Sequence, residues 1–193
     1  MFLPHRPATL PSSRRRSARG LSLAESLVTV CICATLVAVA VPSWQSATHS
    51  MKLSSISNSF AAFVHLARSE AIKRNARVVL CKSAQGAACE SGGSWAQGWI
   101  VFHDANNNGK ADAGEQVIGS AGALPHGYRF SGNTPVAAYL SYTGVGTSKT
   151  TSGAFQAGTF TLCRDGDSPA EAREIAINAL GRPKIRKATL AGC

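Results

Sequence analysis

The sequence has few of the features that mark an enzyme. Only 10 of its 193 residues are acidic, and aromatic residues make up 7%. No serine or cysteine lies close in sequence to a matching base, and the histidines after the first twenty residues are scattered: His49, His65, His103 and His126. The chain also lacks a glycine-rich loop that could cradle phosphate groups, and it has no internal repeat. We therefore expect a binding or structural protein and no catalytic residues.

Acidic residues are missing from the first 20 positions, which carry five arginines: Arg6, Arg14, Arg15, Arg16 and Arg19. The whole chain has a net charge of +10. Without this segment it would keep 15 basic and 10 acidic residues, a net charge of +5. Positive residues beside a membrane span stay on its cytoplasmic side. The sequence therefore predicts a cytoplasmic N-terminus and an exported C-terminal part.

Long hydrophobic runs are absent except for one, from Leu21 to Val41. As a helix it would measure about 31 Å, enough to cross the hydrocarbon core of a bilayer. Its one charged residue is Glu25, and a carboxylate inside a membrane is costly without a partner. A secretory signal has a shorter apolar core with its cleavage site after it. A plain membrane anchor has no need of Glu25, so neither alternative accounts for the pattern.

Two periodicities divide the rest of the chain. Apolar residues at spacings of three and four predict that a helix covers 21–75, with one buried face: Leu53, Ile56, Phe60, Phe63, Ala67 and Ala71. From residue 76, short apolar runs alternate with turn residues and predict strands at 77–81, 98–102, 115–118, 128–130, 139–142, 158–163, 174–177 and 184–186. Residues 143–158, rich in Gly, Ser and Thr, are expected to form a mobile loop. The predicted class is α+β, a long helix, transmembrane in its first half, packed on an antiparallel β-sandwich-like head.

The six cysteines fall into two groups. Cys31 and Cys33 lie in the apolar run, where we expect them to act as small apolar residues. The other four suggest two disulfides in an oxidising compartment, with three possible connectivities. We favour Cys81–Cys89, which closes a short loop, and Cys163–Cys193, which ties the end of the chain to a strand. Their spacings fit no common zinc pattern.

Residues 104–115 match the EF-hand calcium loop position for position. The ligands would be Asp104, Asn106, Asn108, Asp112 and Glu115. The flanking segments are predicted strands, whereas an EF-hand needs helices there. Asn, Asp and Gly also build tight turns without a metal. We therefore favour a turn with no metal and no cofactor, and keep calcium as the alternative.

The C-terminal segment carries four positive charges within six residues, with no acid after them: Arg182, Lys184, Arg186 and Lys187. Such groups bind phosphates by neutralising charge and releasing counterions, and arginine adds bidentate geometry. In a strand, Lys184 and Arg186 would point to one face. The segment lacks interleaved aromatic residues, so DNA binding here would be insensitive to base sequence. The alternative is an ordinary solvated surface.

Gly20, the apolar run and Glu25 resemble the N-terminus of type IV prepilins and type II secretion pseudopilins. The rest of the chain resembles the FimT/GspH minor pilins in several motifs: Ser69–Asn75, Val79–Ser83 with Cys89, Trp95–Phe102, Asp104–Gly109, Thr159–Cys163 and Gly181-Arg182. The resemblance implies that a prepilin peptidase cuts after Gly20 and that Leu21 is then N-methylated. It also implies that Glu25 guides assembly by pairing with the amine of a neighbouring subunit. Leu21 departs from the phenylalanine usual in the family, and Ala24 from a larger aliphatic residue.

The resemblance also implies a domain organisation and a set of partners. Residues 1–20 would be a cleaved leader, 21–42 a transmembrane and filament-core helix, and 43–193 a periplasmic pilin head with an amphipathic helix at 43–75 and a β domain at 76–193. The chain would cross the inner membrane once and later enter a pilus at the cell surface, with other pilins and minor pilins as partners.

The basic segment is similar to the Gly-Arg-x-Arg type of motif with which FimT proteins bind double-stranded DNA for uptake in natural transformation. Arg182 matches the first arginine of that motif and Lys184 takes the place of the second, with Arg186 two residues further. Two alternatives remain open: a type II secretion pseudopilin, and a minor pilin that only primes assembly. Neither of these would bind DNA.

Overall fold

The computed structural model describes residue 20 and residues 22–193, without the side chains of residues 42 and 43. Residues 1–19 of the predicted leader at 1–20, and Leu21 with its predicted methylation, lie outside the described residues. The described chain forms two compact units, one ending at Gln45 and one spanning Ser46–Cys193. Helix α1 (Leu23–Arg74) begins in the first unit and ends in the second. Its bounds lie within two residues of those predicted from the hydrophobic pattern.

Local residues define both ends of α1. Ser22 caps the start, because its Oγ accepts the backbone N–H of Glu25 at 3.2 Å. Glu25 therefore lies in the first turn, where the helix dipole favours a negative charge. At the other end Asn75 adopts a left-handed conformation with φ 49°, as is common just after a helix. Glu70 there accepts from Lys73 and Arg74, and the hydrogen bond from Lys73 is the main cause of its lowered pKa.

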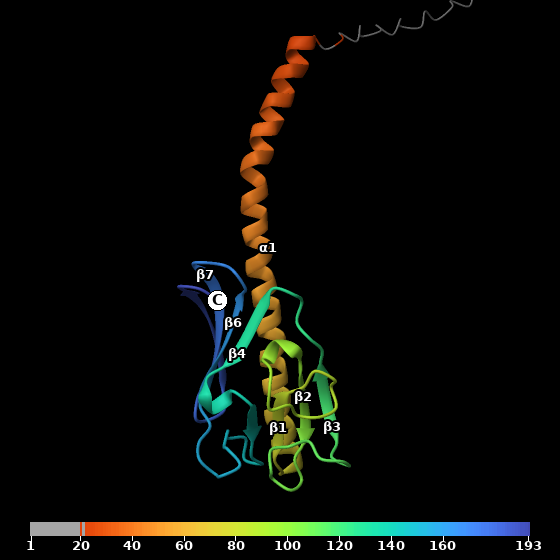
Figure 1. Ribbon diagram of the computed structural model, residues 1–193, viewed down its shortest axis with the longest axis vertical. Coiled ribbons are helices and arrows are strands. Elements are labelled where there is room, and N and C mark those ends of the chain that lie inside the picture. The colour runs from red at the N-terminus through yellow and green to blue at the C-terminus, as the bar shows by residue number, and fades with distance from the viewer. Residues whose placement is uncertain (1–19, 21) are drawn as a thin grey trace, which may run out of the picture. The chain divides into compact units, whose positions relative to one another are not determined.

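The remainder of the chain forms eight strands and two short 3-10 helices. One antiparallel sheet has the order β3-β2-β1-β5 and contains Val117–Ala121, Trp99–His103, Val78–Lys82 and Tyr139–Tyr142. The other has the order β4-β6-β7-β8 and contains Tyr128–Gly132, Gly158–Arg164, Ala170–Ile177 and Pro183–Leu190. The 3-10 helices are η1 (Trp95–Gln97) and η2 (Thr134–Val136). Figure 1 shows the strands lying beside the second half of α1.

Each predicted strand overlaps an observed one, but β7 begins four residues earlier than predicted. The missed residues are Ala170, Glu171, Ala172 and Arg173. Alanine and charged side chains do not give the apolar alternation by which strands are recognised. The same cause hides the end of β8, which runs on to Leu190.

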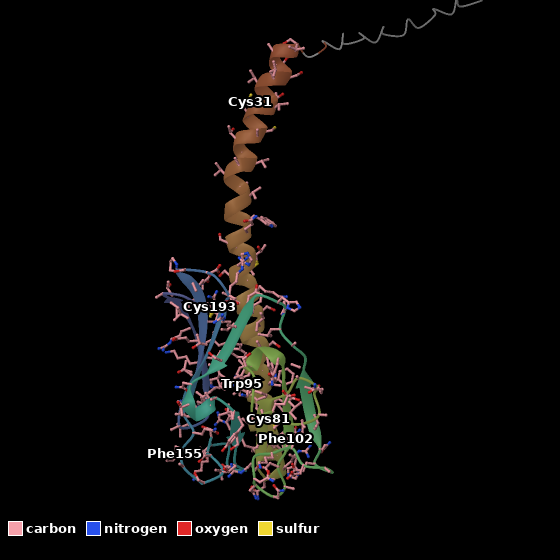
Figure 2. The ribbon with its side chains drawn as sticks, in the orientation of Figure 1. Cys31, Cys81, Trp95, Phe102, Phe155 and Cys193 are labelled. Atoms are coloured by element: carbon pink, nitrogen blue, oxygen red, sulfur yellow. A yellow bond between two sulfur atoms is a disulfide. The ribbon has the colours of Figure 1, made fainter. Side chains whose placement is uncertain are left out.

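The second half of α1 shares one core with both sheets. Phe60 lies at its centre, with ring centroids 4.7–5.5 Å from those of Phe160, Phe130, Trp99 and Trp95. Five of the six predicted core residues of the helix are buried; Phe63 is half-buried, and Val64, which we did not predict, is buried instead. Figure 2 places Trp95 inside the head beside the helix.

Two disulfides lie in small clusters outside the core that the sheets share with α1, and their pairing is the one we favoured from the sequence. Cys81–Cys89 belongs to a small apolar cluster with Val79, Ile100 and Phe102. Cys163–Cys193 lies among residues of β7 and β8: Ala170, Ala172, Ala188 and Leu190. Figure 2 labels one cysteine of each pair. The second disulfide therefore attaches the end of the chain to the sheet that carries the basic segment.

The segment at 143–158 that we expected to be a mobile loop ends in the first residue of β6, and residues 143–157 are held in place by hydrogen bonds. Lys149 and Phe155 form an isolated antiparallel bridge, and the Thr150 N–H donates to Ala154 O at 2.9 Å. The Arg77 guanidinium donates to the carbonyl oxygens of Lys149 and Thr150. A polar, glycine-rich composition can therefore form an ordered hairpin when a half-buried arginine satisfies its carbonyl groups.

Candidate functional site

The described part of the first unit is a helix whose apolar side chains are all exposed. Leu27, Val30, Ile32 and Leu36 each expose between 54% and 65% of their surface. The two threonine hydroxyls of this part donate to carbonyls one turn back, Thr29 to Ser26 and Thr35 to Ile32, both at 2.8 Å. Length and apolar composition make this helix a candidate membrane span. Such a surface needs lipid or another apolar surface to cover it.

The basic segment forms most of β8, the edge strand of its sheet. Its register on β7 pairs Lys184 with Ala176, Arg186 with Glu174, and Lys187 with Arg173. Because directly paired residues point to the same face, Lys184 and Arg186 lie on the face away from α1. Lys187 lies on the other face, beside the buried Arg173. The four predicted DNA-binding residues therefore do not form one surface.

Glu174 further reduces the charge of this segment, because its Oε2 accepts from Arg186 Nε at 2.6 Å. An ion pair of this kind has no net charge to offer a phosphate. Arg182 and Lys184 are both exposed, and within the described chain neither has an ion-pair partner. These two side chains are the strongest phosphate-binding candidates of the four.

Arg182 follows a turn that only glycine fits. Gly181 has φ +74°, and a Cβ there would collide with the ring of Tyr142. The Tyr142 hydroxyl donates to Gly181 O at 2.8 Å, and burial raises the pKa of that hydroxyl further above its ordinary value. The glycine of the Gly181-Arg182 motif thus has a structural reason, and it fixes the position at which Arg182 leaves the sheet.

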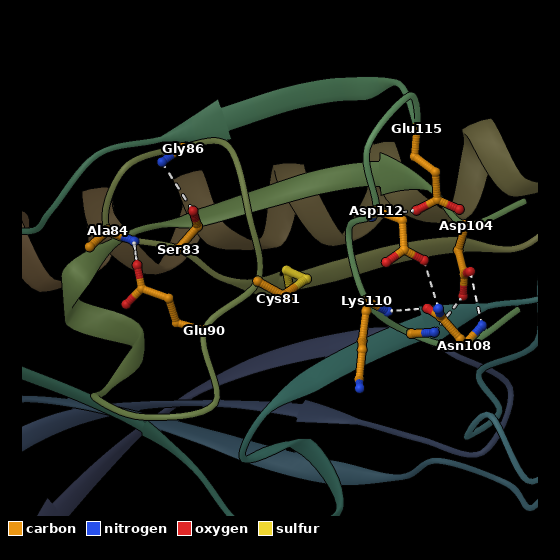
Figure 3. The surroundings of a disulfide bond; sticks show 12 residues. Cys81, Ser83, Ala84, Gly86, Glu90, Asp104, Asn108, Lys110, Asp112 and Glu115 are labelled. Carbon is orange, nitrogen blue, oxygen red and sulfur yellow. Dashed lines mark hydrogen bonds between the residues drawn. A yellow bond between two sulfur atoms is a disulfide. The ribbon is translucent and has the colours of Figure 1, made fainter. Parts of the chain in front are cut away.

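The Asp104–Glu115 segment is a hairpin loop between β2 and β3, and its polar groups bond to one another (Figure 3). Asp104 accepts the N–H groups of Asn108 and Gly109, and Glu115 accepts those of Ala105 and Asp112. Asp112 accepts the side-chain amides of Asn106 and Asn108 at 2.7 Å each, and the bond from Asn106 is the main cause of its lowered pKa. These bonds explain the residue pattern as a self-locking turn.

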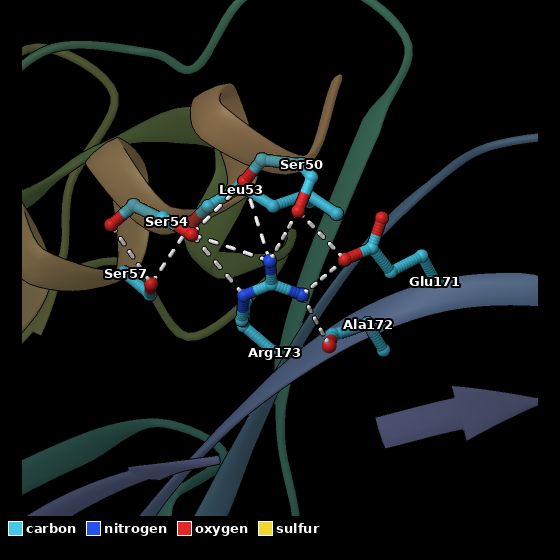
Figure 4. A network of polar contacts seen from close by, with 7 residues as sticks. All are labelled: Ser50, Leu53, Ser54, Ser57, Glu171, Ala172 and Arg173. Atoms are coloured by element: carbon cyan, nitrogen blue, oxygen red, sulfur yellow. Dashed lines mark hydrogen bonds and ion pairs between the residues drawn. The ribbon is translucent and has the colours of Figure 1, made fainter. Parts of the chain in front are cut away.

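Sequence reasoning missed a polar network between α1 and β7 (Figure 4). Arg173 is only 2% exposed, and its guanidinium donates to Glu171 Oε1 at 2.7 Å and to Ser50 Oγ at 2.8 Å. Ser54 Oγ accepts from the same guanidinium at 3.2 Å. The hydrogen bond from Arg173 is the main cause of the lowered pKa of Glu171. The available signal in the sequence was the pair Ser50 and Ser54. These serines are four residues apart, so they lie on one helix face, which continues to Leu53.

A family model described as "Type II transport protein GspH" matches residues 57–181. Two crystal structures of the type IV minor pilin FimU of Pseudomonas aeruginosa align with TM-scores of 0.54 and 0.52, both at 17% identity. They cover 76% and 73% of this chain and 98% and 99% of the FimU chains. At such identities the likeness concerns the fold: a long helix packed on antiparallel sheets.

A structure of the minor pseudopilin EpsH from the type 2 secretion system of Vibrio cholerae aligns at a TM-score of 0.46 and 12% identity. The alignment covers 72% of this chain and 97% of EpsH. No protein of curated function has a detectably similar sequence.

Proposed function

The chain belongs to the GspH family of type II transport proteins, and we propose that it is a minor pilin of a type IV pilus whose head binds DNA. It would be cut after Gly20, methylated at Leu21 and held in the inner membrane until it joins the filament. The head would then lie in the periplasm and later at the cell surface. The role is structural and binding, with no catalytic step.

The observation that carries the assembly role is the exposed apolar surface of α1 before Gln45. A helix that is apolar on every side is stable only in lipid or among other apolar helices. A membrane first and a bundle of pilin helices later would both cover it. Glu25 would then pair with the free amine of a neighbouring subunit, which offsets the cost of burying both charges.

Replacing Glu25 tests this role, although its place in the first turn gives it a local use as well. We expect Glu25→Ala and Glu25→Gln to reduce incorporation into pili at least tenfold, measured by immunoblotting of sheared filaments. The glutamine variant keeps a polar residue in the first helical turn and removes only the charge. Ser26→Ala is the matched control and should assemble normally. Normal assembly of Glu25→Gln would refute the charge-pairing role.

The DNA-binding role is supported by the exposed Arg182 and Lys184, the first held by an ordered turn and the second by its place in β8. We expect the full chain in detergent micelles to bind duplex DNA in a mobility-shift assay, with an affinity that falls steeply as salt rises. Reversing both charges, Arg182→Glu with Lys184→Glu, should abolish the shift. Lys52→Glu with Lys73→Glu makes the same change of net charge on α1 and should retain it. Equal losses in both double variants would mean that the named residues form no site.

A type II secretion pseudopilin is the second candidate, favoured by the description of the family model. The pairing of Arg186 with Glu174 also fits a head that binds no DNA. A minor pilin that only primes assembly would likewise bind no DNA. Absence of any DNA shift at low salt would favour both of these over the first proposal.

A further inference from the structure

The hairpin at 143–157 presents an aromatic side chain to solvent on a fixed backbone. Phe155 exposes 64% of its surface, and Figure 2 places it at the end of the head where the hairpin lies. The next residue, Gln156, is 1% exposed, and its amide donates to Pro135 O at 2.8 Å and to Tyr139 O at 2.9 Å. The backbone beside Phe155 is therefore fixed, while the ring itself is exposed to solvent.

A positive charge accompanies this ring. Lys149 Nζ lies 5.5 Å from the centroid of Phe155, across the isolated bridge that joins the two residues. The backbone of Lys149 is fixed as well, because its N–H donates to Ser141 O at 3.1 Å and its carbonyl accepts from Arg77. The hairpin thus places an ammonium group over one face of an exposed aromatic ring.

The same hairpin is joined to the turn that carries Arg182. The Ser148 hydroxyl donates to Gln156 O at 2.7 Å and lies 3.3 Å from Asn178 O. Asn178 in turn accepts the N–H of Arg182 on its side-chain oxygen at 2.9 Å. One serine therefore connects the residue next to Phe155 with the turn before β8, which brings Arg182, Lys149 and Phe155 to one end of the head.

We propose that Phe155, Lys149 and Arg182 form one nucleic-acid site that prefers DNA with unpaired bases. The proposal rests on the DNA binding proposed above and adds a ligand class to it. Cations attract the phosphates of any DNA, but an aromatic ring stacks on a base only where that base is not already stacked inside a duplex. A single strand supplies both groups, whereas a closed duplex supplies phosphates alone.

Fluorescence anisotropy of the full chain in detergent micelles tests this preference with two probes. One is a labelled 12-nucleotide oligothymidylate, and the other is a 12-base-pair duplex closed by a loop at each end, which offers no frayed ends. We expect the wild type to bind the single strand about tenfold more tightly. Phe155→Ala should lose about tenfold for the single strand and less than twofold for the closed duplex, because one base stack contributes on this scale.

Three variants control the experiment. Val145→Ala removes an exposed apolar side chain from the same hairpin and should change neither affinity. Phe155→Trp should restore single-strand binding, and Arg182→Glu should weaken both probes. If Phe155→Ala leaves the single strand unaffected, or weakens both probes equally, the stacking site is refuted while DNA binding stands. If the wild type binds neither probe, the proposed DNA-binding function fails as well.

Discussion

The two halves of α1 are continuous in secondary structure and opposite in surface. Before Gln45 the side chains are apolar on every side and exposed, whereas from Leu53 to Ala71 one stripe is buried and the rest of the surface is polar. Both halves belong to one helix with the same i to i−4 backbone hydrogen bonding. The buried stripe depends on the sheets around it. One helix can therefore suit two environments. Its first half suits an apolar environment on every side, and its second half suits a protein core on one side only.

The largest effect should come from the centre of the buried stripe. Phe60→Ala removes the ring that contacts four other aromatic rings, so we expect the head to lose about 3–5 kcal/mol of stability. Denaturant unfolding of the full chain in micelles, followed by tryptophan fluorescence, measures this loss. Met51→Ala, on the exposed side of the same helix, should cost less than 1 kcal/mol. Similar losses for the two would show that the stripe does not direct the packing.

The cysteines offer a second contrast between the two units. The disulfide Cys163–Cys193 closes a sequence separation of 30 residues, and its loss should cost roughly 3–4 kcal/mol by loop entropy. We expect the double variant Cys163→Ser with Cys193→Ser to unfold at a lower denaturant concentration. Cys31→Ser with Cys33→Ser, in the exposed half of α1, should unfold like the wild type. A midpoint unchanged by loss of the disulfide would contradict the role assigned to it.

The polar contact between α1 and β7 should respond to pH. Because Arg173 lowers the pKa of Glu171 below its ordinary value of 4.5, the contribution of Glu171 to stability is full at neutral pH and is lost as the pH falls through the lowered value. Glu171→Gln should cost about 1–2 kcal/mol at pH 7, a range reduced for the partial exposure of Glu171, and the difference from wild type should shrink towards pH 3.

Asp165→Asn provides the control, because Asp165 pairs with Arg129 and both side chains are exposed. Its cost should stay below about 0.5 kcal/mol at either pH. If thermal unfolding gives the same Glu171→Gln difference at pH 7 and pH 3, the charge of Glu171 does not stabilise the polar contact between α1 and β7.

The smallest effect concerns the Asp104–Glu115 loop. Its three carboxylates already accept hydrogen bonds from the loop itself, so we expect millimolar calcium to shift the melting temperature of the head by less than about 1 °C. Differential scanning fluorimetry with magnesium as the ionic control measures this. A clear calcium-specific rise would restore the calcium alternative.

The sequence predicts elements better than it predicts the partners of polar residues. The bounds of α1 and the positions of the strands follow from hydrophobic period and turn residues, which act locally. The sequence predicts only in part how the basic residues are divided between the two faces of the sheet. The direction of Lys184 follows from alternation, but the Glu174 that neutralises Arg186 is set by register across β7 and β8.

The same limit explains what was missed at the candidate site. Phe155 is 27 residues from Arg182 in sequence, and the shared site proposed for them rests on the contacts of Ser148 with two other segments. Arg173 was missed because an arginine at an inward strand position is rare. Its burial is tolerable because Ser50 and Ser54 accept its hydrogen bonds, and these serines are far from it in sequence. Such contacts follow from tertiary packing, which no local pattern contains.

The two sheets are separate hydrogen-bonded ladders, and the second half of α1 contributes to the core of both. A tensile force along the helix axis would therefore act in shear on the side-chain contacts of α1. These are the aromatic rings packed around Phe60 and the hydrogen bonds of the Arg173 guanidinium. The backbone ladders would carry little of that load. The mechanical strength of this head is thus expected to reside in a few side chains along one helix face, where single substitutions could tune how much tension it withstands.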